Sequence, residues 1–254
     1  MPYRLLCVTA HPDNESGAFG GALMLAAEAG VETSVLCFTD GHAAHFRGEV
    51  AQGEELGTVR RHEMAAACAL LGVHHHEILQ FPDGKLAQQN FQQMTGVVVE
   101  RIRRARPHVV LTFAGDGAVN LHRDHTMISL VATAAFHWAY REDMFPEQLQ
   151  AGLRPWTSQK LYYSSTPFVS VRDHPELDNS PTGPWSLTLD LSEPLAQRKV
   201  EAFAQHRTQQ GVLQRVGADR IRHMHFERYL LAAKRGPAAV TEDTAMFAGM
   251  DDPA

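Results

Sequence analysis

Short apolar runs that each end in a polar motif constrain the fold of this chain most strongly. The runs cover residues 3–10, 31–38, 77–81 and 108–113. Each is followed by a segment with helical periodicity, which predicts helices over 17–29, 58–71, 91–105 and from HRDH at 122–125 to about 140. Recurring strand–helix alternation predicts an α/β fold with a mainly parallel sheet and helices on both faces.

The pattern changes after residue 155. The runs KLYYSSTPF and SLTLDL read as strands on either side of a loop rich in Pro, Asn, Asp and Gly. Helices are expected over 194–210 and 219–234, so a strand and helix extension completes a single domain over residues 1–235. Residues 236–254 are rich in small, acidic and proline residues and predict a flexible tail.

Bulk composition excludes several classes of protein. The chain has 254 residues and a net charge of −6, without a long basic run, which argues against a nucleic-acid or anionic-membrane surface. It contains no apolar stretch long enough for a transmembrane helix and no signal core, so a cytoplasmic protein is expected. Its three cysteines lie in apolar segments and read as buried free thiols. Because exposed sheet rims often pack together, a homo-oligomer is compatible with the sequence.

Polar motifs at the strand ends identify the candidate site. In a parallel sheet, ligands collect beyond the carboxyl ends of the strands. His11, Asp40, Asp83 and the loop before His122 all fall at such ends. His122 and His125 are three residues apart and share one side of a helical turn.

These residue types suit a metal-dependent hydrolase. A catalytic zinc takes three protein ligands, keeps a position for water and lowers the pKa of that water to about 7. His11, Asn14 and His125 are candidate ligands, while Asp13 and His122 could accept and donate protons. Each motif also has an interpretation without a functional role, since His-Pro-Asp is a frequent turn and H-x-x-H is often two surface histidines. Their convergence on one predicted rim favours function.

Two acidic residues have equally open roles. Asp124 could hold a metal-binding imidazole or could be a helix-start acid favoured by the helix dipole. Glu15 has the same ambiguity beside the first helix.

Several motifs resemble those of the LmbE/PIG-L family of zinc-dependent N-acetylglucosamine deacetylases. HPDNE at 11–15 resembles the family signature HPDDE, and HRDH at 122–125 resembles its HPDH. The resemblance covers roughly residues 3–210 in the same order and also includes TDG at 39–41, Arg60-x-x-Glu63, LG at 71–72, PDGKL at 82–86 and KVEAFAQHRTQ at 199–209.

The resemblance implies a Rossmann-like fold and a set of roles. It puts the Zn²⁺ ligands, with another divalent cation as an option, on His11, Asn14 and His125. It puts the general base on Asp13 and the histidine that assists the oxyanion and the leaving amine on His122. Two further residues, Arg60 and Asp83, align with positions that hold substrate hydroxyls in sugar-binding relatives.

The implied activity is the removal of an acetyl group from an N-acetylglucosamine-type conjugate by metal-activated water. Some family members instead cleave the amide of a thiol conjugate of the mycothiol or bacillithiol type. The partner is thus a small molecule, an amino-sugar conjugate. The loop at 42–57 and the segment 168–186 are expected to select the rest of the substrate. His206 and Gln209 either approach the rim or serve packing.

Asn14 departs from the family pattern, which has a metal-binding Asp at this position. A neutral amide is a weaker ligand than a carboxylate, so metal affinity should be lower and the bound water more acidic. Alternatively, Asp13 enters the coordination shell and Glu15 or another acid becomes the base. A third reading is a sugar-binding homologue that has lost catalysis.

Overall fold

The computed structural model describes residues 2–115, 117, 122–165, 185–216, 222–236 and 245–250. Its strands are β1 (Arg4–Thr9), β2 (Glu32–Cys37), β3 (His75–Ile78), β4 (Val109–Phe113), β5 (Lys160–Ser165), β6 (Leu187–Asp190) and β7 (Phe226–Lys234). Its α-helices are α1 (Asn14–Gly17), α2 (Gly20–Glu28), α3 (Glu54–Leu71), α4 (Phe91–Ala105), α5 (Arg123–Trp138), α6 (Pro146–Gln150), α7 (Glu193–Ala204) and α8 (Gln210–Val216). Short 3₁₀ turns are η1 (Leu86–Gln88), η4 (Arg207–Gln209) and η5 (Arg222–His225).

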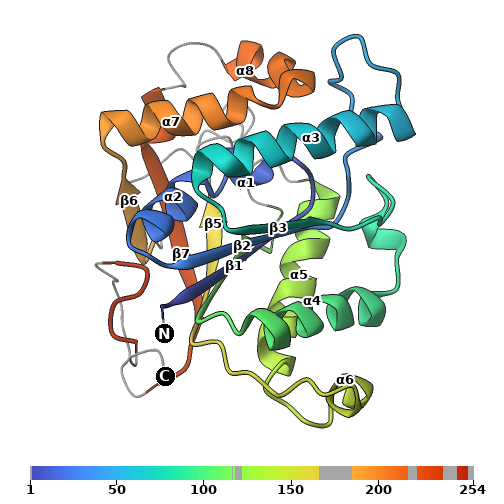
Figure 1. Cartoon of the computed structure of the whole chain (residues 1–254), viewed down its shortest axis with the longest axis vertical. Helices are drawn as coiled ribbons and strands as arrows, with labels where there is room; N and C mark the ends of the chain where they lie inside the picture. Colours follow the sequence, from blue (N-terminus) through green and yellow to red (C-terminus); the bar gives the residue numbers. More distant parts are fainter. Residues whose placement is uncertain are drawn as a thin grey trace.

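A seven-stranded sheet in the order β3-β2-β1-β4-β5-β7-β6 forms the centre of the described structure. Strands β1 to β5 pair in parallel, and β7 pairs antiparallel with both β5 and β6. In Figure 1, α3 and α7 lie over one face of the sheet, with α2 beside them, and α4 and α5 lie over the other. The α/β class predicted from the sequence is therefore confirmed.

The direction of chain winding reverses between β1 and β4. The chain runs from β1 outward to β2 and β3, then returns to build β4 and β5 on the opposite side. At such a switch point the loops beyond the carboxyl ends of neighbouring strands separate and leave a crevice. The loops after β1 and β4 carry HPDNE and lead to HRDH.

The helix predicted over 219–234 is wrong. Residues 226–234 form β7, which fills the gap between β5 and β6. The segment FERYLLAAK contains good helix formers, but helix propensity amounts to only a few tenths of a kcal/mol per residue. Pairing with two neighbouring strands outweighs it. Other boundaries differ less from the prediction: β3 covers His75–Ile78 instead of 77–81, and α7 ends at Ala204 instead of at 210.

Part of the segment predicted as a flexible tail packs on the sheet. Residues 245–250 are described, and Met246 is only 6% exposed within the core. The backbone carbonyl of Met246 accepts a hydrogen bond from Lys160 Nζ at 3.3 Å. These residues therefore pack against the beginning of β5.

A carboxylate from β7 accepts hydrogen bonds from the N-terminus of α2. Glu227 accepts hydrogen bonds from the backbone amides of Gly21 and Ala22 at 2.6 and 2.9 Å, and Lys199 Nζ lies 2.6 Å from it. A Cβ on Gly21 would sit 2.9 Å from the Glu227 carboxyl carbon, which explains the glycine. The chain's own anion therefore occupies the place where helix N-termini commonly bind phosphate.

The remaining sequence expectations concern bulk features. All three cysteines are free and buried, as predicted. Within the described segments, no helix combines the length and apolar character needed to cross a bilayer. Most of the 168–186 segment lies outside the described residues.

Candidate active site and metal centre

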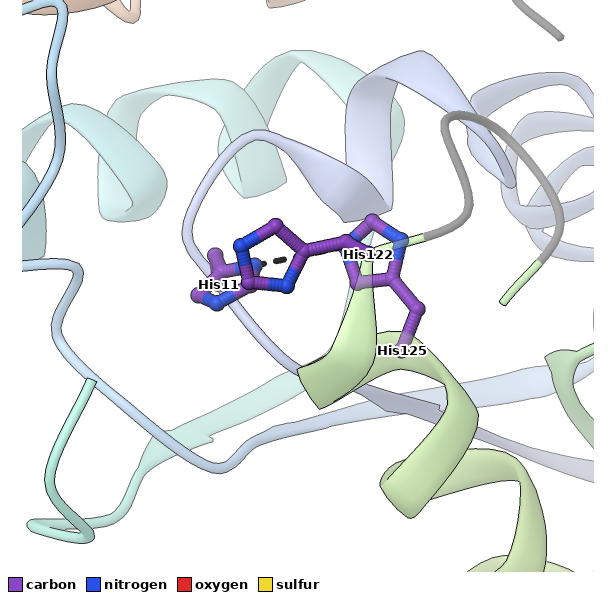
Figure 2. Close-up of side chains that lie close together, drawn as sticks. All are labelled: His11, His122 and His125. Atoms are coloured by element: carbon purple, nitrogen blue, oxygen red, sulfur yellow. Dashed lines mark hydrogen bonds between the residues drawn. The ribbon is translucent and has the colours of Figure 1, made fainter. Parts of the chain in front are cut away.

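Three histidines meet at the switch point of the sheet. His11 follows β1. His122 is the N-cap residue of α5, and His125 lies within the first turn of the same helix (Figure 2). Nδ1 of His11 is 3.3 Å from Nε2 of His125, and the His11 and His122 ring centroids are 4.8 Å apart. The sequence separates the first histidine from the pair by more than a hundred residues, and the sheet topology brings them together.

Two buried carboxylates hold the other side of the His11 ring. Nε2 of His11 lies 3.1 Å from Asp83 and 3.2 Å from Asp124. Asp124 also accepts backbone hydrogen bonds from Gly84 and Leu86 at 2.8 and 3.1 Å. Asp124 therefore both sits in the first turn of α5 and holds an imidazole, so the two roles left open by the sequence are compatible.

This environment separates the proton affinities of the histidines. Burial by itself would lower the pKa of His11, but hydrogen bonds that its ring donates to Asp124 and Asp83 outweigh burial and raise that pKa to about 9. Burial lowers the pKa of His125 well below its ordinary value, and the neighbouring His11 adds to this effect. Burial likewise lowers the pKa of His122. His125 and His122 are thus neutral imidazoles at pH 7, the form that binds metals.

Asp13 has a fixed, strained position. Its φ of 106° lies in the left-handed region that non-glycine residues rarely adopt. Its carboxylate accepts hydrogen bonds from Arg60 Nη2 at 3.1 Å and from Asn14 Nδ2 at 2.9 Å. Burial raises the pKa of Asp13 despite the opposing charge of Arg60, a direction that suits a general base working near neutral pH.

Asn14 is tied to its neighbours on both sides of its amide. Its Oδ1 accepts a hydrogen bond from the His11 backbone amide at 2.8 Å, while Nδ2 donates to Asp13. These two bonds define which end of the amide is oxygen. Asn14 is buried and lines the cavity described below.

Arg60 is almost completely buried, and its guanidinium forms hydrogen bonds with other residues of the protein. Its guanidinium donates to the carbonyl of Pro12, to Asp13 and, at 3.1 Å, to the carbonyl of Gly41. Asp83 is similarly engaged, because it contacts His11 and accepts the Ala43 amide at 2.9 Å. Both residues line the cavity. Their predicted contact with sugar hydroxyls stays a prediction, whereas their role in holding the loops is visible.

Glu15 is fully buried and is not among the residues that line the cavity. One oxygen lies 2.6 Å from Nε2 of His206, and the other accepts the Asp13 backbone amide at 2.9 Å. Burial raises the pKa of Glu15, but His206 more than compensates and lowers it. The reading in which Glu15 replaces Asp13 as the base is therefore disfavoured, and Glu15 instead fastens the Asp13 backbone to the end of α7.

A cavity of about 520 Å³ opens over these groups. Its lining includes ionisable and polar side chains: His11, Asp13, Asn14, His45, Arg60, Asp83, His122, His125 and Gln209. The lining also includes apolar residues that are absent from the predicted site: Ala18, Ala43, Ala44, Phe46, Phe203 and Val212. No motif marks these apolar residues, although the loop at 42–57 is predicted to select the substrate.

The donor set fits a divalent cation. The ligand atoms of His11, His122 and His125 lie within 4.8 Å of one another, as do those of His11, Asp83 and Asp124. Neutral imidazoles with nearby carboxylates suit zinc and neighbouring transition metals.

The chain is similar in sequence to known proteins. The profile of the PIG-L family, described as GlcNAc-PI de-N-acetylase, matches residues 6–136. A 1D-myo-inositol 2-acetamido-2-deoxy-alpha-D-glucopyranoside deacetylase of Nakamurella multipartita is 33% identical over 53% of this chain and 55% of its own length. A mycothiol S-conjugate amidase of Streptomyces coelicolor is 28% identical over 72% of this chain and 68% of its own length.

A solved structure shares the fold. The N,N'-diacetylchitobiose deacetylase of Pyrococcus horikoshii superposes with a TM-score of 0.70 at 20% identity, covering 89% of this chain and 82% of the other. The match of the family profile to more than half of the sequence establishes the relationship: the chain belongs to the PIG-L family.

Proposed function

We propose that this protein is a zinc-dependent amide hydrolase that removes the acetyl group from an N-acetylglucosamine-type sugar conjugate. One observation carries the proposal: His11, His125, Asp13 and His122 line one cavity at the switch point of the sheet. Membership of the PIG-L family and the names of the related deacetylases support the reaction type and the sugar class.

We infer that His11, His125 and Asn14 hold the metal. When bound, zinc polarises the amide carbonyl and makes a water molecule acidic enough to attack near neutral pH. Asp124 and Asp83 orient His11 from the far side of its ring, as metal-bound imidazoles usually require.

Asp13 is assigned the proton transfer. Its raised pKa lets it accept a proton from the attacking water and release that proton to the departing amine. Arg60 and Asn14 hold one carboxylate oxygen each and fix the direction of the transfer. Asp13 alone therefore carries the proton from the attacking water to the departing amine.

His122 is assigned to the oxyanion. Its Nδ1 accepts the Asp124 backbone amide at 3.1 Å, so in the neutral ring Nε2 carries the hydrogen. A neutral donor of this kind stabilises the negative oxygen that develops as water attacks. This assignment is narrower than the sequence expectation, in which His122 also protonates the amine.

A second candidate is cleavage of the amide in a thiol conjugate, supported by the similarity to the mycothiol S-conjugate amidase. The same groups would perform that reaction. The sugar-binding homologue without catalysis is the remaining alternative, and a metal assay addresses it: a bound metal favours hydrolysis, and sugar binding without metal favours the binding protein.

The test is amine release from a panel of N-acetylglucosamine conjugates and one thiol-conjugate amide, with zinc added back after chelation. We expect zinc-dependent release from at least one acetamido sugar. The matched variant Asp13→Asn keeps the shape of the side chain and should release almost none. Release from the thiol conjugate alone would favour the second candidate, and zinc-independent release would contradict the proposal.

A further inference from the structure

Hydrogen bonds hold the backbone of Asp13 on both sides of its left-handed conformation. Its φ of 106° is one that non-glycine residues rarely adopt. The Asp13 carbonyl accepts the Gly17 amide at 2.9 Å and the Ser16 hydroxyl at 3.1 Å. The Asp13 amide donates to Glu15 Oε2 at 2.9 Å. Because a strained conformation of this kind persists only where its surroundings impose it, the acceptor on Glu15 has a mechanical role.

The Glu15 carboxylate is itself fixed by His206. Its other oxygen lies 2.6 Å from Nε2 of His206, and both side chains are fully buried. His206 follows the end of α7 and lies 191 positions after Glu15 in the chain. Phe203 of α7 packs so closely on α1 that a Cβ on Gly17 would lie 3.0 Å from its ring. A distant helix therefore determines where the carboxylate beside Asp13 lies.

Neither side chain of this pair is placed to touch a substrate. Glu15 and His206 are absent from the described lining of the cavity. Nδ1 of His206 is also buried and has no hydrogen-bond partner among the described residues. Buried ionisable pairs often stabilise a protein no more than apolar side chains of the same volume, so folding stability explains this pair poorly. Its bond to the Asp13 amide is what connects it to the site.

We propose that Glu15 and His206 are positioning residues for the hydrolysis. His206 orients the Glu15 carboxylate, and that carboxylate holds the Asp13 backbone so that the Asp13 side chain faces the attacking water. This inference rests on the proposed hydrolase function and extends it to residues that do not touch the substrate. A displacement of about 1 Å at a reacting group can cost about 10²-fold in rate. Loss of the anchor should therefore lower kcat and leave KM nearly unchanged.

Two double variants separate anchoring from stability. Glu15→Met with His206→Met, the Met pair, leaves no unpaired buried charge but removes the acceptor of the Asp13 amide. Its kcat for amine release should fall about 10- to 100-fold, with KM within about threefold of the wild type. Glu15→Gln with His206→Gln, the Gln pair, keeps an acceptor for the amide and a hydrogen bond between the two side chains. It should recover most of kcat.

Two controls isolate the effect of the anchor. Glu227→Gln with Lys199→Met alters a second buried ion pair, which bonds to the start of α2. This variant should lower the melting temperature yet keep kcat within about twofold of the wild type. Glu15→Met alone, in which His206 can lose its proton, is a second protein without the acceptor and should behave like the Met pair.

Hydrogen exchange measures the anchor without turnover. Nuclear magnetic resonance of the metal-free wild type should show slow exchange of the Asp13 amide, because its acceptor is buried. Exchange should be about tenfold or more faster in the Met pair and slow in the Gln pair.

Several results would overturn the inference. They are a wild-type kcat in the Met pair, an Asp13 amide that exchanges as slowly there as in the wild type, and a loss of kcat that the Gln pair does not recover. Failure of both Met variants to fold would also overturn it, since the pair would then be structural. A wild type that releases no amine refutes the hydrolase instead, and the exchange rates still decide whether Glu15 anchors Asp13.

Discussion

Asn14→Asp restores the carboxylate that the PIG-L signature usually has, and it perturbs only one atom. In the structure, Asn14 Nδ2 donates to Asp13 Oδ1 at 2.9 Å. An oxygen in that place faces another carboxylate oxygen instead of donating to it. The change should therefore have opposite effects on the metal-free and the metal-bound protein.

Without metal, the variant should be less stable. It loses a hydrogen bond in a largely buried place, worth about 1–3 kcal/mol, and gains repulsion from Asp13. For a chain of this size each kcal/mol lowers the melting temperature by about 2–4 °C. The Oδ1 atom still accepts the hydrogen bond from the His11 backbone amide, so the turn itself should persist.

With metal, the variant should gain affinity. Two unit charges about 4 Å apart interact by about 4 kcal/mol at an effective dielectric constant of 20. A divalent cation attracts the new carboxylate with twice that energy, whereas the repulsion from Asp13 acts with and without the metal and therefore cancels from the change in affinity. Even after desolvation, at least a tenfold increase in affinity, about 1.4 kcal/mol, should remain.

Calorimetric zinc titration and thermal denaturation, with and without chelator, measure both effects. Asn90→Asp is the matched control, because Asn90 caps α4 and Asp caps helices equally well. It should leave zinc affinity and stability unchanged. If Asn14→Asp binds zinc no better than the wild type, Asn14 is not a metal ligand and the electrostatic reasoning fails.

Other substitutions test separate parts of the structure. Asp13→Ala and His122→Ala should fold normally yet lose most turnover, with His122→Ala lowering kcat by about 10²–10³; near-wild-type steady-state rates would reject the assigned role. Glu227→Gln leaves buried Lys199 without its charge partner and should cost about 3–5 kcal/mol in urea denaturation, whereas adding Lys199→Met should recover part of that loss. His108 accepts the Arg4 backbone amide at 3.0 Å, and burial lowers its pKa to about 4. Because the unfolded chain binds this proton more readily, the stability due to neutral His108 is complete above about pH 6.5 and falls by up to about 3 kcal/mol as pH drops toward 4. His108→Asn keeps an acceptor and should flatten that part of the curve, and an unchanged slope would contradict the assignment.

The sequence predicts the parallel part of the fold because its signals are local. Apolar runs such as 3–10 and 108–113 end in turn motifs, and the intervening helices have clear stops. The antiparallel edge was harder, since β7 consists of residues that suit a helix and becomes a strand through pairing with β5 and β6. Propensity carries no information about such distant partners.

The candidate site likewise combines residues that local sequence signals predict with residues that only tertiary packing brings together. His11, Asp83 and HRDH follow strands directly, so the rule about carboxyl ends of parallel strands brings them to one rim. The apolar residues that line the cavity follow no such rule. Phe46, Phe203 and Gly211 are ordinary in sequence, and their relation depends on how α8 packs against a long loop. The two hydrogen bonds of the Glu15 carboxylate, one with His206 and one accepted from the Asp13 backbone amide, depend equally on tertiary packing.

The protonation of His11 links the proposed metal site to the carboxylates beside that histidine. Asp83 and Asp124 both approach one ring nitrogen, and their hydrogen bonds hold the pKa of His11 at about 9. In the protein without a cation, a proton therefore supplies the positive charge that these buried carboxylates need. A cation held by His11, as proposed above, would remove the need for that proton and would supply more positive charge from nearly the same place. The same two carboxylates that keep His11 protonated thus make the site attractive to a divalent metal, even though Asn14 contributes no charge.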